Sequence, residues 1–412
     1  MNNNLQSRLV RITQKRTLLR NALIVFGVVL FSIGVIILGR FLGFYNTIHS
    51  ATQRTQPVAE KKEKKNEYTF LLMGYGGGRH DGTFLTDTII VVNVNLKSKR
   101  ILLISIPRDL WVKVPTKDSK FYSKINAVYQ MALFPDNYPN VDSSLFSKEN
   151  PSGLIKQVVE NITGLKIDAY ATIDFSGFVK AIDTLGGIEI TVERSFTDYE
   201  YPIEGKENEL CGREEEFAQI EPILNNSMSQ HDKDTLFTQN PQLKLFYENI
   251  KNNPPQAFPC RFEELHFDAG LNSMDGKTAL KYARSRHSQE DGGDFNRAKR
   301  QQKVLEAIKR KVLAIGFIPK IIPLLNELEN HIITDLPLGD MNMLLLEGRN
   351  ANKYTTETLV ISDTFLTDSY SDEGQYIVIP KFGIDDWDQI KRAITIMKEG
   401  ITPSPLPTHA SL

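Results

Sequence analysis

The stretch DTIIVVNVNLKSKRILLISIP (Asp87–Pro107) contains two β-branched, apolar runs separated by the short connection LKSK. Runs of this composition are typical of buried β-strands, and a short connection between two of them predicts a hairpin. The run YTFLLMG (Tyr68–Gly74) has the same character and predicts another strand before the hairpin. Together these runs indicate the centre of a β-sheet.

Helical patterns follow the strands. DAYATID (Asp168–Asp174) predicts a strand, FSGFVKAIDTL (Phe175–Leu185) a helix, and IEITV (Ile188–Val192) a further strand. Asp294–Val312 predicts the longest helix, because its apolar residues recur at helical spacing. Short strands over Leu359–Pro380 and a helix over residues 385–398 complete the pattern. We therefore expect a mixed α/β (α+β) fold with a central β-sheet flanked by helices.

The regular pattern is lost between Glu193 and His266, and we interpret residues 194–265 as a long insertion. The insertion contains both cysteines of the chain, Cys211 and Cys260. In an oxidising compartment, a disulfide that closes this loop contributes about 4 kcal/mol to stability. Two unpaired thiols are the alternative.

The N-terminal region predicts a membrane anchor. An uncharged run, ALIVFGVVLFSIGVIILG, follows five basic residues and no acidic one. Its length and flanks predict a single transmembrane helix with the N-terminus inside the cell and the folded domain outside the cytoplasmic membrane. A cleaved signal peptide is the alternative. We expect a cytoplasmic segment (1–21), the transmembrane helix (22–45), a linker (46–67), the extracytoplasmic domain (68–400) and a disordered tail (401–412).

The charge balance argues against nucleic-acid binding. The chain has 49 Lys and Arg residues against 50 Asp and Glu residues, so its net charge is -1. A nucleic-acid-binding domain usually carries a basic patch and a positive net charge. Any anion site in this protein must therefore be local.

One short window, YARSRHSQEDGGDFNRAKRQQ (Tyr282–Gln302), concentrates four arginines. The preceding residues, from Ser273, predict a helix that includes Arg284. Residues two apart point to nearly opposite sides of a helix, so Arg284 and Arg286 can serve one anion only if the chain leaves the helix near Arg284. The turn-forming residues SQEDGG provide that exit.

The next predicted helix begins near Asp294 and places Arg297 and Gln301 on one face. Guanidinium groups bind phosphate oxygens in a planar, bidentate way, so a phosphate or pyrophosphate is the natural ligand of such a cluster. The alternative is that the arginines form weak surface ion pairs with Glu290, Asp291 and Asp294.

Two other motifs follow or connect strands. SIPRDLWV places Arg108 and Asp109 after an apolar strand, and GYGGGRHDGTFLTDT places His80, Asp81 and Asp87 in a glycine-dense connection. Carboxylates beside a bound phosphate suit Mg²⁺, which takes one or two carboxylates plus substrate oxygens. The alternative is that Asp87 caps a turn and His80 is an ordinary loop residue.

Five motifs occur in a characteristic order: SIPRD, KINAVY (Lys124–Tyr129), FVKAIDTLGGIEI, ALKYARSR and GDFNRAKRQQ. In this order and spacing the chain resembles the LytR-CpsA-Psr family of membrane-anchored envelope phosphotransferases. The resemblance extends over Tyr68–Leu313 apart from the insertion. It implies a central sheet with packed helices and an apolar tunnel for a lipid.

The resemblance also implies an activity and a set of site residues. Such proteins move a glycan from a polyprenyl-pyrophosphate carrier to a hydroxyl of a cell-wall acceptor such as peptidoglycan, forming a phosphodiester with Mg²⁺ or Mn²⁺. By position in the motifs, the pyrophosphate would be held by Arg108, Arg284, Arg286, Arg297 and Gln301. Catalysis would involve Asp294 with Arg108, Arg284 and Arg286, and the metal would be held by Asp87 and Asp81.

One position departs from the family pattern. Gly76 stands where members commonly carry an aspartate, so His80 or Asp81 would have to supply the missing metal contact. This departure favours an alternative function, a non-catalytic protein of the envelope that binds or senses polyprenyl pyrophosphates. Hydrolysis of the pyrophosphate is a third possibility.

Overall fold

The computed structural model describes residues 39–43, 45–47, 65–77, 83–117, 120–147, 150–314, 324, 327–348 and 350–400. The predicted cytoplasmic segment, most of the predicted transmembrane helix and linker, the predicted tail, His80 and Asp81 lie outside the described residues. Among the residues described, no helix has both the length and the apolar character needed to span a bilayer.

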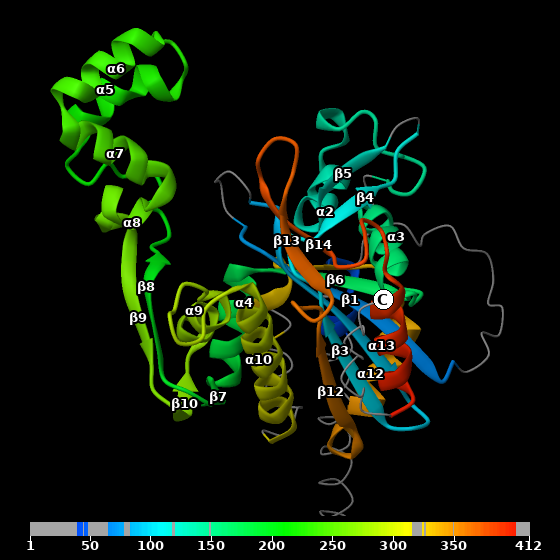
Figure 1. Ribbon diagram of the computed structural model, residues 1–412. Helices are drawn as coiled ribbons and strands as arrows, with labels where there is room; N and C mark the ends of the chain where they lie inside the picture. The colour runs from blue at the N-terminus through cyan, green and yellow to red at the C-terminus, as the bar shows by residue number, and fades with distance from the viewer. Residues whose placement is uncertain are drawn as a thin grey trace, which may run out of the picture.

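A mixed sheet forms the centre of the molecule, with strand order β11-β6-β1-β2-β3-β12 (Figure 1). The strands are β1 (Glu67–Tyr75), β2 (Thr86–Asn95), β3 (Arg100–Ser105), β6 (Ala169–Asp174), β11 (Ile332–Thr334) and β12 (Thr355–Val360). The predicted hairpin is confirmed, because β2 and β3 pair antiparallel. The β1–β6 and β3–β12 pairs are parallel, and the β1–β2 and β11–β6 pairs are antiparallel.

One face of the sheet carries the largest hydrophobic core. Side chains alternate across a strand, and those of Leu71, Ile89 and Ile104 point into this core. Apolar residues of three helices cover them, from α2 (Ile125–Leu133), α3 (Ser152–Thr163) and α13 (Asp388–Lys398). Nearby are the hairpins β4 (Trp111–Val114) with β5 (Phe121–Lys124) and β13 (Leu366–Tyr370) with β14 (Tyr376–Pro380).

The other face of the sheet lies under a second layer, formed by α4 (Phe175–Leu185), α9 (Gly276–Arg284) and α10 (Asp294–Ala314). Gln302 of α10 donates a 2.8 Å hydrogen bond to Ser105 of β3, which holds the helix to the sheet. The predicted strand at Ile188–Val192 forms β7, but it pairs with β10 (Gly270–Met274) outside the central sheet.

The prediction of a helix from Ser273 is wrong for its first residues. Ser273 and Met274 belong to strand β10, and helix α9 begins at Gly276. Asp275 is the reason, because its carboxylate accepts a 2.7 Å hydrogen bond from the backbone nitrogen of Thr278 and caps the helix there.

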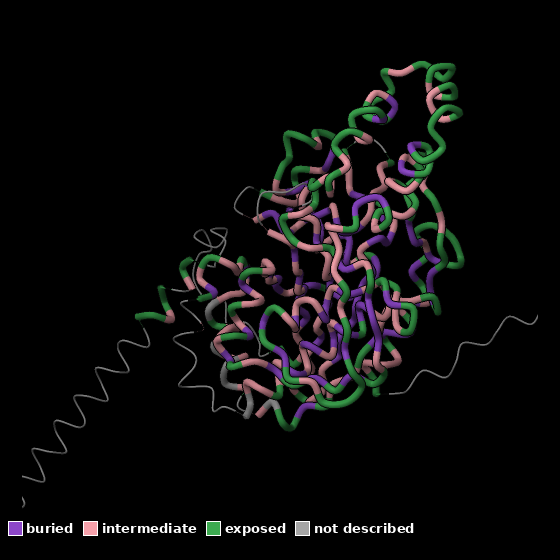
Figure 2. The backbone as a smooth tube through the Cα atoms, turned by 90° about the vertical axis from the view of Figure 1, so that its left-hand side faces the viewer, coloured by how far each residue is buried: buried purple, intermediate pink, exposed green. Residues whose placement is uncertain are grey.

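The insertion is an ordered arm. Strands β8 (Phe196–Pro202) and β9 (Phe262–Phe267) pair and carry four short helices at their far end, away from the main body (Figure 1). The helices are α5 (Glu214–Leu224), α6 (Gln230–Gln239), α7 (Pro241–Asn252) and α8 (Pro254–Ala257). Buried segments gather in the main body, whereas the arm is largely exposed (Figure 2). The sequence pattern is weak here because the helices are short and bury at most two residues each, and α6 has no buried residue.

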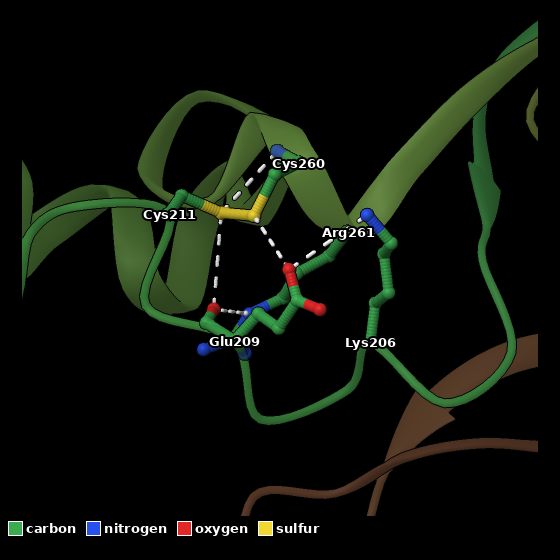
Figure 3. Close-up of a disulfide and its surroundings, with 5 residues drawn as sticks. All are labelled: Lys206, Glu209, Cys211, Cys260 and Arg261. Atoms are coloured by element: carbon green, nitrogen blue, oxygen red, sulfur yellow. Dashed lines mark hydrogen bonds and ion pairs between the residues drawn. A yellow bond between two sulfur atoms is a disulfide. The ribbon is translucent and has the colours of Figure 1, made fainter.

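A disulfide between Cys211 and Cys260 closes the helical end of the arm, so the alternative of two unpaired thiols is wrong. Beside it, the backbone oxygen of Glu209 accepts a 2.6 Å hydrogen bond from Arg261 (Figure 3). The helices also share a small core of their own that includes Ile220 and Phe246. The arm therefore has its own internal stabilisation.

Candidate functional site

A cavity of about 500 Å³ lies between the central sheet and the helices α4, α9 and α10. We call it the arginine cavity. Its inner walls are apolar, with Leu72 and Ile90 from the sheet and Phe178, Leu280 and Leu305 from the helices. Four arginines line it, Arg108, Arg284, Arg286 and Arg297, together with four acidic residues, Asp87, Asp174, Asp198 and Glu200. The cavity thus combines apolar side chains with a cluster of arginines, some of which have acidic neighbours.

Arg108 follows strand β3 and lies between two carboxylates. Its Nη1 is 2.7 Å from Asp87, and its Nε is 3.3 Å from Asp109. Burial by itself lowers the pKa of the Arg108 guanidinium, but Asp87 and Asp109 more than offset this effect and raise the pKa. Arg108 is therefore a fixed positive charge in the cavity wall.

The chain leaves helix α9 at Arg284, as the sequence predicts. Ser285 has extended backbone angles, with φ -55° and ψ 135°, and both Arg284 and Arg286 line the cavity. The Arg284 guanidinium lies 4.5 Å from the centre of the Phe175 ring and within 3.5 Å of the Tyr201 hydroxyl. The structure gives Arg284 no acidic partner among the described residues, so its charge is available to a ligand.

Arg297 lies one turn into helix α10 and is buried, with its Nη1 3.1 Å from Asp294. Burial lowers the pKa of Arg297 to about 10, and although Asp294 counteracts this effect, the charges of Arg108 and Arg286 add to it. Gln301 lies one turn further along the same helix and also lines the cavity. The predicted common face of α10 is thus present.

Asp294 does not itself line the cavity but contacts two of its arginines. It lies 3.1 Å from Arg297 and 3.9 Å from Arg286. Asp109 forms a second acidic group nearby, bonded to Lys124 at 2.7 Å. Burial would raise the pKa of Asp109, but the bond from Lys124 and the charge of Arg108 lower it overall. Asp109 and Lys124 lie in the motifs SIPRD and KINAVY, but the sequence predicts no role for either residue.

Arg300, the fourth arginine of the window, does not belong to the cavity lining. Its side chain is 2 % exposed and bonds to the carboxylate of Asp291 at 2.8 Å and to the backbone oxygen of Ser285. The alternative, that the arginines form surface ion pairs, therefore names the right partner for Arg300, which is Asp291. It is wrong about the location, because this ion pair is buried on the Arg300 side. Through these bonds, Arg300 of helix α10 stabilises the turn at Ser285.

Asp198 is a residue that sequence reasoning missed. It lies in β8 at the base of the arm, is 1 % exposed, and accepts hydrogen bonds from Ser285 Oγ at 2.8 Å and from the backbone nitrogens of Arg286 and His287. Burial would raise the pKa of Asp198, but these hydrogen bonds lower it overall. The only sequence signal was an acid at an inward position of the run FTDYEY.

The residues present offer limited ligation for a metal. Among the described residues, no three His, Cys, Asp or Glu side chains form a group that could hold an ion. Asp87 lines the cavity, and only its Oδ1 is bonded to Arg108. One carboxylate together with phosphate oxygens is a donor set that Mg²⁺ accepts, so Asp87 fits the predicted ligand role.

Several of the arginines in the cavity lie close enough together to repel one another. Burial and the neighbouring Arg108 are the main causes that lower the pKa of Arg286, and the same pair of effects acts on Arg297. Such a lowered pKa means that the guanidinium groups repel one another and lack full compensation. A bound anion with several oxygens would relieve this repulsion.

Comparison with known proteins identifies the family. The sequence model of the LytR_cpsA_psr family matches residues 41–391. The chain belongs to this family. Among curated LytR_cpsA_psr relatives, TagU of Enterococcus faecalis, a polyisoprenyl-teichoic acid–peptidoglycan teichoic acid transferase, is 22% identical over 84% of this chain and 89% of its own. The Bacillus subtilis transferase of the same description, TagV, is 23% identical over 82% of this chain and 71% of its own.

Solved structures share the fold. A crystal structure of a Streptococcus agalactiae protein aligns with a TM-score of 0.52 at 18% identity, covering 84% of this chain and 93% of the other. The crystal structure of Bacillus subtilis TagV aligns with a TM-score of 0.50 at 21% identity, covering 83% of this chain and all of the other. The mixed α/β architecture is therefore that of known LytR_cpsA_psr proteins.

Proposed function

We propose that this protein is a membrane-anchored phosphotransferase that moves a glycan from a polyprenyl-pyrophosphate carrier to a hydroxyl of a cell-wall acceptor. The N-terminus lies inside the cell, a single helix crosses the cytoplasmic membrane, and the domain works outside it. The observation that supports this proposal most is that Arg108, Arg284 and Arg286 line one cavity that also has many apolar lining residues. Such a cavity matches a pyrophosphate attached to a lipid.

The arginines hold the two phosphates and the apolar wall holds the polyprenyl chain. The acceptor oxygen forms a bond to the phosphorus that carries the glycan, and the bond from that phosphorus to the bridging oxygen breaks. Polyprenyl phosphate leaves with the electron pair of that bond, and its growing charge is stabilised by Arg108, Arg284 and Arg286. Asp294 does not line the cavity but contacts Arg286 and Arg297, and in this proposal it takes the proton of the acceptor hydroxyl.

Asp87 would hold Mg²⁺ or Mn²⁺ together with phosphate oxygens, and Asp81 is the second predicted ligand. When bound, the ion neutralises phosphate charge. The predicted transfer therefore requires a divalent ion, and a chelator tests that requirement.

The decisive experiment uses the full chain in detergent with a lipid-linked glycan, a peptidoglycan acceptor and Mg²⁺. Release of polyprenyl phosphate together with glycan attached to the acceptor supports the transferase. Release without an acceptor would instead indicate pyrophosphate hydrolysis.

A binding or sensing protein is the second candidate function. It is favoured by Gly76 in place of the family's aspartate and by the scarcity of metal ligands among the described residues. Tight binding of the lipid-linked glycan without any release of carrier, in the same assay, would support this function and contradict the transferase.

A further inference from the structure

A second cavity, of about 840 Å³, lies away from the arginine cavity. It is lined by strand β4, by residues 115–117 and 120 of the connection that follows, by helix α3 and by residues at and before the start of helix α13. Helices α3 and α13 cover the face of the sheet opposite α4, α9 and α10. We call it the lysine cavity, after Lys113, Lys117, Lys120 and Lys391, which line it.

Lys113, Lys117 and Lys120 lie close together in the chain, and the tertiary structure brings Lys391 of helix α13 to them. None of the four forms an ion pair with a residue that the structure describes. Asp385 is the one acidic lining residue in the described part of the chain, and it accepts a 2.6 Å hydrogen bond from the hydroxyl of Tyr122. The cavity therefore has an excess of positive charge in a chain whose net charge is -1.

The wall of the cavity offers more than charge. Trp387 lines it although its side chain is largely buried, with 6 % exposure of the residue. Asn161 and Thr116 also line the cavity and add polar side chains to its wall. The amide and hydroxyl groups suit the hydroxyls of a sugar. Trp387 packs mainly in the core, so it contributes a fixed side chain to the cavity wall and lies where its fluorescence reports on a ligand.

Solvated surface lysines are the ordinary interpretation of such a patch. Two observations favour a ligand. The lysines surround a concave space large enough for several sugar units, and charges of one sign gathered in a cleft concentrate the field on ions of the opposite sign. A flat bilayer surface does not enter a concave space, so an anionic membrane is a poor fit.

We propose that the lysine cavity binds an anionic glycan, that is, a polymer whose units carry phosphate or carboxylate groups. The hairpin of β4 and β5 connects this site with the arginine cavity. At its base Lys124 bonds to Asp109, and its far end carries Lys117 and Lys120. At roughly 3.3 Å per residue of strand, the two ends lie within about 30 Å, a distance that one polymer chain can span.

The test exploits the small number of tryptophans, because the chain has only two. In full-length protein carrying Trp111→Phe, Trp387 is the only source of tryptophan fluorescence. Poly(glycerol phosphate), hyaluronan, neutral dextran and phosphatidylglycerol vesicles are titrated in turn. We expect a saturable fluorescence change with a polyanion and no change with dextran. The affinity for the polyanion should fall severalfold when the salt concentration rises from about 50 mM to about 500 mM.

Lysine variants locate the binding. When Lys113, Lys117, Lys120 and Lys391 are all changed to Gln, we expect the affinity for the polyanion to fall about tenfold or more, because four screened charge contacts are lost. A matched control changes four exposed lysines elsewhere, Lys97, Lys251, Lys277 and Lys353, to Gln and retains binding.

The outcome separates this proposal from the transferase. Binding of either polymer supports the lysine cavity, and the polymer that binds identifies the anion as phosphate or carboxylate. The proposal is wrong if no polyanion changes the Trp387 signal, if both lysine sets weaken binding equally, or if only the vesicles bind. Because the readout requires no turnover, a failure here leaves the proposed reaction untouched.

Discussion

Asp198 of strand β8 accepts a 2.9 Å hydrogen bond from the backbone nitrogen of Arg286. The two residues are 88 positions apart in the chain, and the bond joins the base of the arm to the arginine cavity. The arm therefore contributes to the shape of the site, because Tyr201 and Pro202 of the same strand also line the cavity.

Changing Asp198 to Asn should remove the charged acceptor of the hydrogen bonds that the turn at Ser285 donates. We expect transfer to fall about tenfold or more, and stability to fall by about 1–3 kcal/mol because buried donors lose a charged partner. Measured kcat and KM, with denaturant unfolding, check this expectation. Asp268→Asn is the matched control, since the Asp268 side chain is 86% exposed. Equal activities of the two variants would show that Asp198 does not position Arg286.

The effect of Asp198→Asn on stability should depend on pH. The pKa of Asp198 is lowered in the folded protein, so its stabilisation is fully present above the unfolded pKa of about 3.9 and is lost as pH falls through the folded pKa. The stability difference between wild type and Asp198→Asn should therefore be largest above about pH 5 and shrink below about pH 4. Unfolding curves recorded across this range measure it, and a difference that does not change with pH contradicts the assignment.

Arg108→Ala and Arg284→Ala test the pyrophosphate site. Each should lower transfer about a hundredfold, because a lost transition-state contact costs on the order of 3 kcal/mol. For Arg284, which has no acidic partner among the described residues, stability should change little. The exposed Arg392→Ala serves as the control. Normal turnover by both cavity variants would remove the arginine cavity from the mechanism.

Arg300→Met should behave in the opposite way. The side chain is buried and bonded to Asp291, so its loss leaves a carboxylate and the Ser285 carbonyl without their partner. Breaking a buried pair costs about 3–5 kcal/mol, which denaturant unfolding would detect. The exposed Arg310 provides a control with the same substitution. If Arg300→Met unfolds like the wild type, the proposed stabilisation of the turn at Ser285 is incorrect.

The disulfide should stabilise the arm selectively. It joins residues separated by 49 positions, and replacing both cysteines by Ser should cost about 4 kcal/mol by loop-entropy reasoning. Hydrogen exchange should accelerate in α5–α8 and stay unchanged in the central sheet, because the arm has its own small core. Reductant should have no further effect on the double variant. Faster exchange in the sheet instead would mean that the arm and body unfold together.

Several features followed from the sequence because their causes are local. The strands of Asp87–Pro107 and the hairpin between them required only the apolar pattern and a short connection. The exit from the helix at Arg284 followed from the turn-forming residues after it. The helices of the arm did not, because each is short and contributes at most two residues to the buried core.

The sequence by itself determined the fold class and the family, and it indicated which window holds the arginines of the proposed anion site, since each of these depends on residue type and order. Only the tertiary structure decided which charges meet. Arg297 and Arg300 are three residues apart on one helix, yet Arg297 lines the cavity and Arg300 is enclosed against Asp291 and Phe196. Their different surroundings come from strands and turns distant in sequence, because packing partners, and not spacing, set the environment of a side chain.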